Sequence, residues 1–135
     1  MPVTPNSIIT PQIPKAATAA LTAANTVLTD SPTNTVTLVT AGSNGARVTK
    51  ISAIPRATLT ATLIQLFRST DAGVTKRLFD CALIPACTIT MGTDVPTTDF
   101  GYSEASPILL QAGESIYAAL GATGNVCVLA EWGDY

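Results

Sequence analysis

The sequence predicts an all-β protein, an antiparallel β-sandwich or jelly-roll-like barrel that carries an extended N-terminal arm. Seven to nine short runs of alternating or β-branched residues recur along the chain, turn residues separate them, and no run has the pattern of a convincing helix. The 135 residues suit one domain. We therefore assign residues 1–14 to the arm and residues 15–135 to a single sandwich domain.

Four prolines shape the arm, namely Pro2, Pro5, Pro11 and Pro14. Proline fixes its own φ and biases the preceding residue toward extended backbone, so this segment is not a helix. Residues 7–10 are β-branched and apolar but too few to form a core. We expect the arm to contact a neighbouring subunit through Ile8, Ile9 and Ile13, partly by adding a strand to an exposed sheet edge. Folding back or fraying are the alternatives.

Residues 15–28 alternate alanine, leucine and valine with threonine, and this alternation predicts a strand. The threonines also recur at every fourth position and alanine is the best helix former, so a helix is the alternative interpretation. We prefer the strand because β-branched threonine is stiff in a helix and because the run lacks a stripe of large apolar residues.

Two β-hairpins are expected next. Runs at 34–40 and 47–54 flank Asn44 and Gly45, and both of these residues tolerate the positive φ of a tight turn. Runs at 58–69 and 74–84 meet at a second turn, residues 70–73. The remaining chain predicts a short strand at 87–91, a long connection at 92–107, and strands at 108–110, 115–120 and 125–132.

The composition predicts contact with other proteins. Hydrophobic residues make up 47% of the chain and charged residues only 12%, about half the usual share of roughly 25%. A surface this weakly charged indicates buried subunit contacts. A monomer with a threonine-rich surface is the alternative.

Charge and hydropathy argue against several partners. The net charge is -2 and only seven residues are basic, so we expect no nucleic-acid binding, which depends on Lys and Arg at phosphates. There is no polybasic tract for a membrane surface and no apolar run near the roughly 20 residues of a membrane span. The first 13 residues lack the features of a signal peptide, which predicts synthesis in a cytoplasm.

Candidate chemistry is sparse. The chain has no histidine, the commonest general base and metal ligand. Asp94, Asp99 and Glu104 in the long connection could form a carboxylate pair or a calcium site, but their Thr, Pro and Gly neighbours are typical of solvated turns. We expect no catalytic residue, no metal and no cofactor.

The cysteines and the glycine-rich turn also have structural explanations. Three cysteines without histidine fall short of a four-ligand zinc site, so we expect small buried side chains. A disulfide between Cys81 and Cys87 is the alternative if the chain reverses between them. Residues 121–124 lack the lysine and helix of a phosphate loop. Trp132 and Tyr135 are expected to close the sandwich or to pack on a partner, with a ligand platform as the alternative.

Several segments resemble the small structural proteins of tailed bacteriophages that decorate or cement the head. They are residues 5–12 (PNSIITPQ), 66–73 (LFRSTDAG), 110–117 (LQAGESIY) and 130–135 (AEWGDY). The resemblance implies a β-sandwich on the capsid exterior of a virion. It also implies a homotrimer whose partner is the major capsid protein, and it implies no fixed set of functional residues.

Two other functions fit the same sequence. One is a tail, head-tail joining or fibre-associated virion protein. The other is a carbohydrate- or receptor-binding sandwich, which rests on fold class alone. Aromatic residues, which stack on sugars, make up only 5% of the chain.

Overall fold

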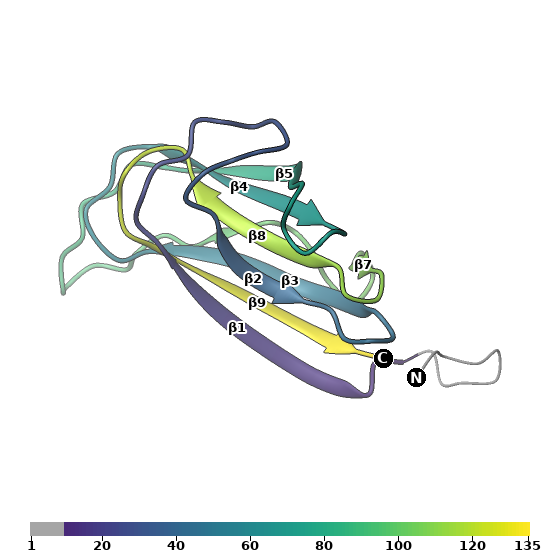
Figure 1. Cartoon of the computed structure of the whole chain (residues 1–135). Coiled ribbons are helices and arrows are strands. Elements are labelled where there is room, and N and C mark those ends of the chain that lie inside the picture. Colours follow the sequence, from purple (N-terminus) through teal and green to yellow (C-terminus); the bar gives the residue numbers. More distant parts are fainter. Residues whose placement is uncertain (1–9) are drawn as a thin grey trace.

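The computed structural model describes residues 10–135, which form two antiparallel β-sheets packed face to face (Figure 1). The strands are β1 (Ile13–Leu21), β2 (Val36–Thr40), β3 (Ala46–Pro55), β4 (Thr62–Ser69), β5 (Arg77–Ile84), β6 (Thr98–Asp99), β7 (Ile108–Leu110), β8 (Ser115–Leu120) and β9 (Val126–Asp134). No helix that could cross a membrane is found within residues 10–135.

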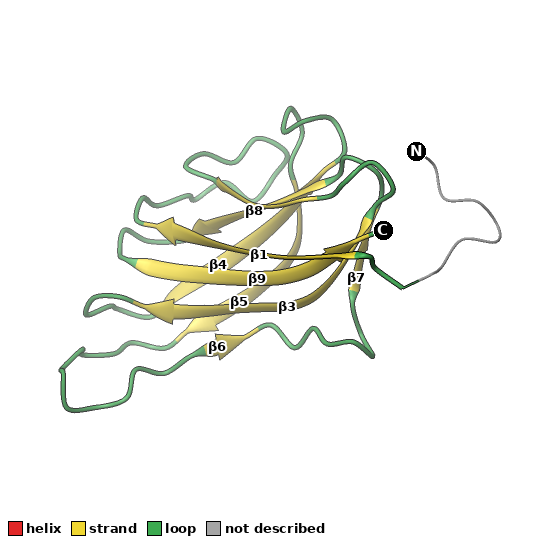
Figure 2. Cartoon of the chain, turned by 90° about the horizontal axis from the view of Figure 1, so that it is seen from below, coloured by secondary structure: helices red, strands yellow, loops and turns green. Residues whose placement is uncertain are grey.

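The strand order is that of a jelly roll. One sheet has the order β1-β9-β3-β6, with β7 pairing another part of β3, and the other has the order β2-β8-β4-β5. From β1 to β4 the chain changes sheet at every connection, and it returns through β8 and β9 to the middle of both sheets. Figure 2 shows β1, β9, β3 and β6 side by side in this order. This winding of two four-position sheets is characteristic of the jelly roll. The predicted all-β class and sandwich architecture are confirmed.

The core lies between the sheets and follows the period of two. In β9, Val126, Val128 and Ala130 are fully buried, whereas the intervening Cys127 and Leu129 are partly exposed. Ile64 of β4 and Ile116 of β8 face them from the second sheet and are also fully buried. Each large aliphatic side chain removed from water contributes about 1.5–3 kcal/mol. All three cysteines are free thiols, so the Cys81–Cys87 disulfide does not form.

The first predicted hairpin is wrong, and the second is confirmed. The turn at residues 42–45 forms, with Gly45 at a φ of 87°. However, β2 pairs with β8 and β3 pairs with β9, so the turn carries the chain from one sheet to the other. A turn sequence specifies that the chain reverses direction. It does not specify that the two strands on either side of the turn are hydrogen-bonded to each other. The strands β4 and β5 do pair directly across the 70–73 turn.

The strand expected at 15–28 is shorter than predicted, because β1 ends at Leu21 and the next residues cross the outer face of the second sheet. The side chain of Asn25 is fully buried there. Its Nδ2 donates to Gln65 Oε1 of β4 at 2.7 Å, and its Oδ1 accepts from the Thr33 amide at 2.9 Å. The backbone N–H of Asn25 also donates to the Leu120 carbonyl at 2.7 Å. Asn25 therefore holds this connection against the sheet.

Smaller differences concern the ends and the long connection. β1 begins at Ile13, so Ile13 and Pro14 belong to the domain and not to the arm. The short strand expected at 87–91 is reduced to one isolated bridge between Leu59 and Cys87. The connection at 92–107 contains the two-residue strand β6, which pairs with β3.

We expect Asn25→Ala to lower the free energy of unfolding by about 3 kcal/mol, because it leaves several buried partners of the amide without a hydrogen bond. Chemical denaturation of the purified chain measures the change. The neighbouring exposed Thr26 provides the control, since Thr26→Ala should change stability by less than about 0.5 kcal/mol. Equal losses in the two variants would contradict this role of Asn25.

Candidate partner-binding site

The first described residues, 10–12, meet the β1-β9-β3 sheet at the end where the C-terminus also lies (Figure 2). The Gln12 amide donates to the Asp134 carbonyl at 2.8 Å and extends the contact of β1 with β9 by one residue. Pro11 lies directly against Gly133, where any Cβ would collide with the proline ring. Glycine at 133 is therefore what allows residues 10–12 to cross close over β9.

A shallow groove of about 600 Å³ lies beside this crossing. Its lining comes from the first described residues, β1, β3, β9 and the β6–β7 connection, and includes Thr10, Pro11, Pro14, Arg47, Thr49, Glu104, Glu131 and Gly133. Arg47 lies 3.8 Å from the exposed Glu104 carboxylate, so the charges at this end balance. The groove suits a segment of polypeptide better than a strongly charged ligand.

A buried carboxylate fixes the geometry of this end. Asp134 is 2% exposed, and its Oδ2 lies 2.7 Å from Lys15 Nζ on the adjacent strand. Its other oxygen accepts from the Gly42 amide at 3.2 Å. Removing Lys15 would leave a buried charge with one weak partner, which is costly. The pair thus ties β1, the C-terminus and the turn at residues 42–45 together.

The structure brings part of the predicted contact set to this place. Ile13 begins β1 and is 52% exposed. Trp132 is buried in the core and borders the groove. Tyr135 is partly exposed, and its amide donates to the Gly45 carbonyl at 3.2 Å. Trp132 therefore offers a partner little surface in the isolated chain. Ile8 and Ile9 lie outside the described residues.

The three acidic residues singled out in the long connection do not converge. Asp99 accepts from the Gly101 amide at 2.8 Å, Glu104 contacts Arg47, and Asp94 is exposed. Within residues 10–135 no three His, Cys, Asp or Glu side chains are placed to hold a metal ion. The expected burial of the cysteines is wrong. Cys81 is exposed on β5, where it falls on the outward register of the strand, and Cys87 and Cys127 are partly exposed.

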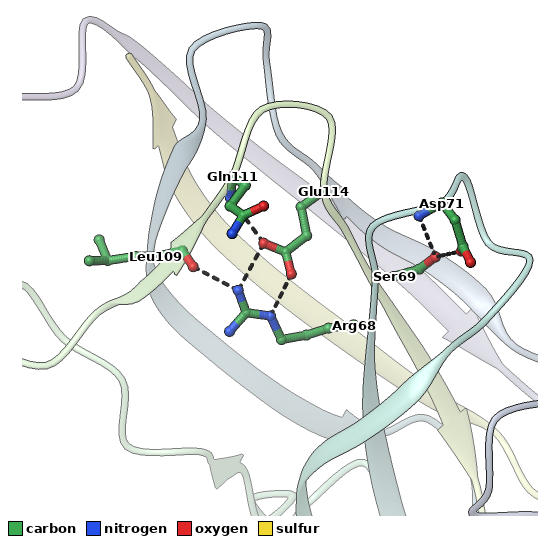
Figure 3. A network of polar contacts seen from close by, with 6 residues as sticks. All are labelled: Arg68, Ser69, Asp71, Leu109, Gln111 and Glu114. Carbon is green, nitrogen blue, oxygen red and sulfur yellow. Dashed lines mark hydrogen bonds and ion pairs between the residues drawn. The ribbon is translucent and has the colours of Figure 1, made fainter.

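A polar cluster around Glu114 was not predicted from the sequence. Arg68 of β4 binds Glu114 in a two-point contact, with Nε to Oε2 and Nη2 to Oε1 both at 2.8 Å, and Nη2 also donates to the Leu109 carbonyl (Figure 3). The Gln111 amide donates to Glu114 at 2.9 Å. Nearby, Ser69 Oγ donates to Asp71 at 2.8 Å and organises the β4–β5 turn.

These contacts decide the ionisation of Glu114. Burial acts to raise the pKa of its carboxyl, but the hydrogen bonds from Arg68 and the Gln111 amide outweigh burial and hold the pKa below its usual value of 4.5. The carboxylate stays charged and clamps the β7–β8 turn to β4. Because these partners come from the chain itself, we assign the cluster a structural role.

The chain shows little similarity to known proteins. Neither the protein-family models nor the curated protein sequences contain a match. Among solved structures it is similar to one described as "Structure of infectious bursal disease virus Gt strain", with 14% sequence identity and a TM-score of 0.25. That match covers 96% of this chain and 39% of the viral one. A likeness at this level carries no argument, so the proposals below rest on the residues.

Glu114→Gln should reduce stability most at neutral pH. A carboxyl whose folded pKa is depressed contributes stability above its unfolded pKa, and this contribution is lost as the pH falls through the folded value. The stability gap between wild type and E114Q should therefore be largest above about pH 4.5 and shrink on acidification. Urea denaturation at pH 7 and pH 3 measures both gaps, and equal gaps would contradict the assignment.

Gly133→Ala should release residues 10–12 from the sheet, because the new methyl group would collide with Pro11. Amide hydrogen exchange at Gln12 should accelerate while the strand centres stay protected. Gly92→Ala is a matched control, since a Cβ there meets no atom within 4 Å. Unchanged protection of Gln12 in G133A would show that the close crossing does not depend on glycine.

Proposed function

We propose that this protein is a structural component of a phage virion, located on the capsid exterior, where it cements neighbouring major capsid proteins. Its partners are then the major capsid protein and further copies of itself, in a homotrimer. The observation that carries the proposal is the position of residues 10–12, which are held at the surface beside the groove. We propose that Ile8 and Ile9, which precede them in the sequence, bind the neighbour.

The exterior of the described domain supports a role in assembly. Val74, Leu83, Met91 and Leu109 are each more than 60% exposed, although they are large and apolar. Few charges separate them, since charged residues make up 12% of the chain. Exposed apolar side chains on a weakly charged surface favour contact with other proteins.

A cement acts by mass action. A protein that binds only the expanded capsid lattice stabilises that lattice in proportion to the logarithm of its free concentration over its dissociation constant. At a concentration about 100 times the dissociation constant, each site contributes about 2.7 kcal/mol. Many such sites on one shell add up to substantial resistance to internal pressure, and no reaction is required of the bound protein.

Deletion of residues 1–9 should leave the domain folded and abolish binding to shells. The deletion stops before Thr10 because Gln12, Ile13 and Pro14 are part of the sheet contact with β9. Co-sedimentation with expanded and unexpanded shells measures binding, and wild type should bind the expanded form selectively.

A double substitution, Ile8→Ser with Ile9→Ser, separates side-chain contacts from segment length, and Thr4→Ala is its control. Shell occupancy that is unchanged by the deletion would contradict the role of the segment. Binding confined to one vertex or to tails would instead favour a tail or head-tail joining protein.

A further inference from the structure

The two sheets differ in how their edges are protected. An edge strand presents unpaired N–H and C=O groups to which a foreign strand can bind, and proteins block such edges with bulges, charges or short strands. β2 has five residues and a register shift between Thr37 and Val39. β6 has two residues. Neither offers a long regular edge.

The edge of β5 is long but blocked. Its pairing with β4 contains a register shift opposite Leu66 and Phe67. In the middle of the strand, Oδ1 of Asp80 accepts from the Cys81 amide at 2.8 Å, and Oδ2 accepts from the Tyr102 hydroxyl. The carboxylate thus accepts the hydrogen bond of the Cys81 N–H, which an added strand would need as a donor.

Of these protections, the edge of β1 has Pro14 and Lys15 near its start and none from Ala16 to Leu21. Its nine residues pair with β9 without any shift, from Ile13 opposite Asp134 to Leu21 opposite Val126. Within residues 10–135, β9 is the only strand that pairs with β1. Its one charged residue, Lys15, is bound to Asp134. Ala16, Thr18 and Ala20 are small and exposed.

Pro14 indicates which backbone groups face outward. Proline has no N–H, so it fits an edge strand when its nitrogen lies on the open side. Because successive residues alternate, Ala16, Thr18 and Ala20 then direct their N–H and C=O groups to the same open side. Three donors and three acceptors are thus available over a length of about 15 Å.

We propose that residues 7–10 of a second copy of this chain bind as an added strand along the open edge of β1. This inference rests on the proposed structural role. It specifies that residues 7–10 bind a second copy of the chain and that β1 is the strand they bind. The segment, Ser-Ile-Ile-Thr, is β-branched and bounded by Pro5 and Pro11, and its four residues span about 13 Å. The small Ala16 and Ala20 side chains leave room for the isoleucines.

The position of Pro11 favours a second copy over the same chain. Pro11 lies against Gly133, which is on the β9 side of β1 and opposite to the open edge. To reach its own edge the chain would have to cross back over β1. A segment that leaves one copy and binds a different surface of the next makes a head-to-tail contact. Such contacts form a ring, for example a trimer, when the rotation from copy to copy closes.

The test compares the mass of four forms by light scattering at equal concentration. The full chain should be oligomeric. The form lacking residues 1–9 and the Thr18→Pro variant should both shift to monomer, because one loses the strand and the other an outward N–H. Leu83→Pro is the control, because it places a proline in an edge strand whose edge is blocked, β5. This variant should keep the mass of the full chain.

A peptide of residues 1–12 keeps the test independent of variant folding. In excess it should dissociate the wild-type oligomer, and it should bind the form lacking residues 1–9 in a saturable way. A monomeric full chain, or an oligomer that persists without residues 1–9, would overturn the inference. Monomers that still coat shells would refute the inference and the homotrimer but leave the role on the capsid standing. An oligomer of this kind that binds no shell would support the inference and contradict the role on the capsid.

Discussion

The edge strands of a two-sheet sandwich carry backbone N–H and C=O groups that have no partner strand, and most proteins block these groups. In this chain some edge strands are blocked and one is largely open. β5 ends its sheet with a register shift and the Asp80 carboxylate, and β6 is only two residues long. β1 ends the other sheet with nine regular residues and small side chains. An edge of that kind is a liability in a solitary protein and a binding element in an assembly. The proposed contact between copies of the chain depends on this asymmetry.

Three buried polar side chains hold the connections in place around the core. Asn25 fixes the crossing from β1 to β2, Glu114 fixes the turn before β8, and Asp134 fixes the end where the chain joins the sheet. Each has partners from at least two separate parts of the sequence, so each converts a loop into a fixed part of the structure. Their removal exposes unpaired groups rather than empty volume, which is why single substitutions there are expected to be costly.

Much of the fold could be predicted from alternation and turn residues. The strands at 115–120 and 108–110 and the β4–β5 hairpin follow the sequence closely because local pattern determines them. The sheet change at residues 42–45 could not be predicted, because Asn44 and Gly45 specify a reversal and carry no information about the partner strand. The contacts Arg68–Glu114 and Asn25–Gln65 join residues 46 and 40 positions apart, and no spacing in the sequence reveals them. Of the predicted contact residues, Ile13 lies exposed at the start of β1, whereas Trp132 is taken into the core because its register faces inward.

We propose that this weakly charged jelly roll acts through its surface, its open edge and its N-terminal segment. The most direct measurement is the position and number of copies of this protein on purified phage particles, by electron cryomicroscopy with a labelled chain. The account predicts many copies distributed over the head, at or near three-fold positions, with the β1 edge occupied. Particles that lack the protein entirely would contradict it.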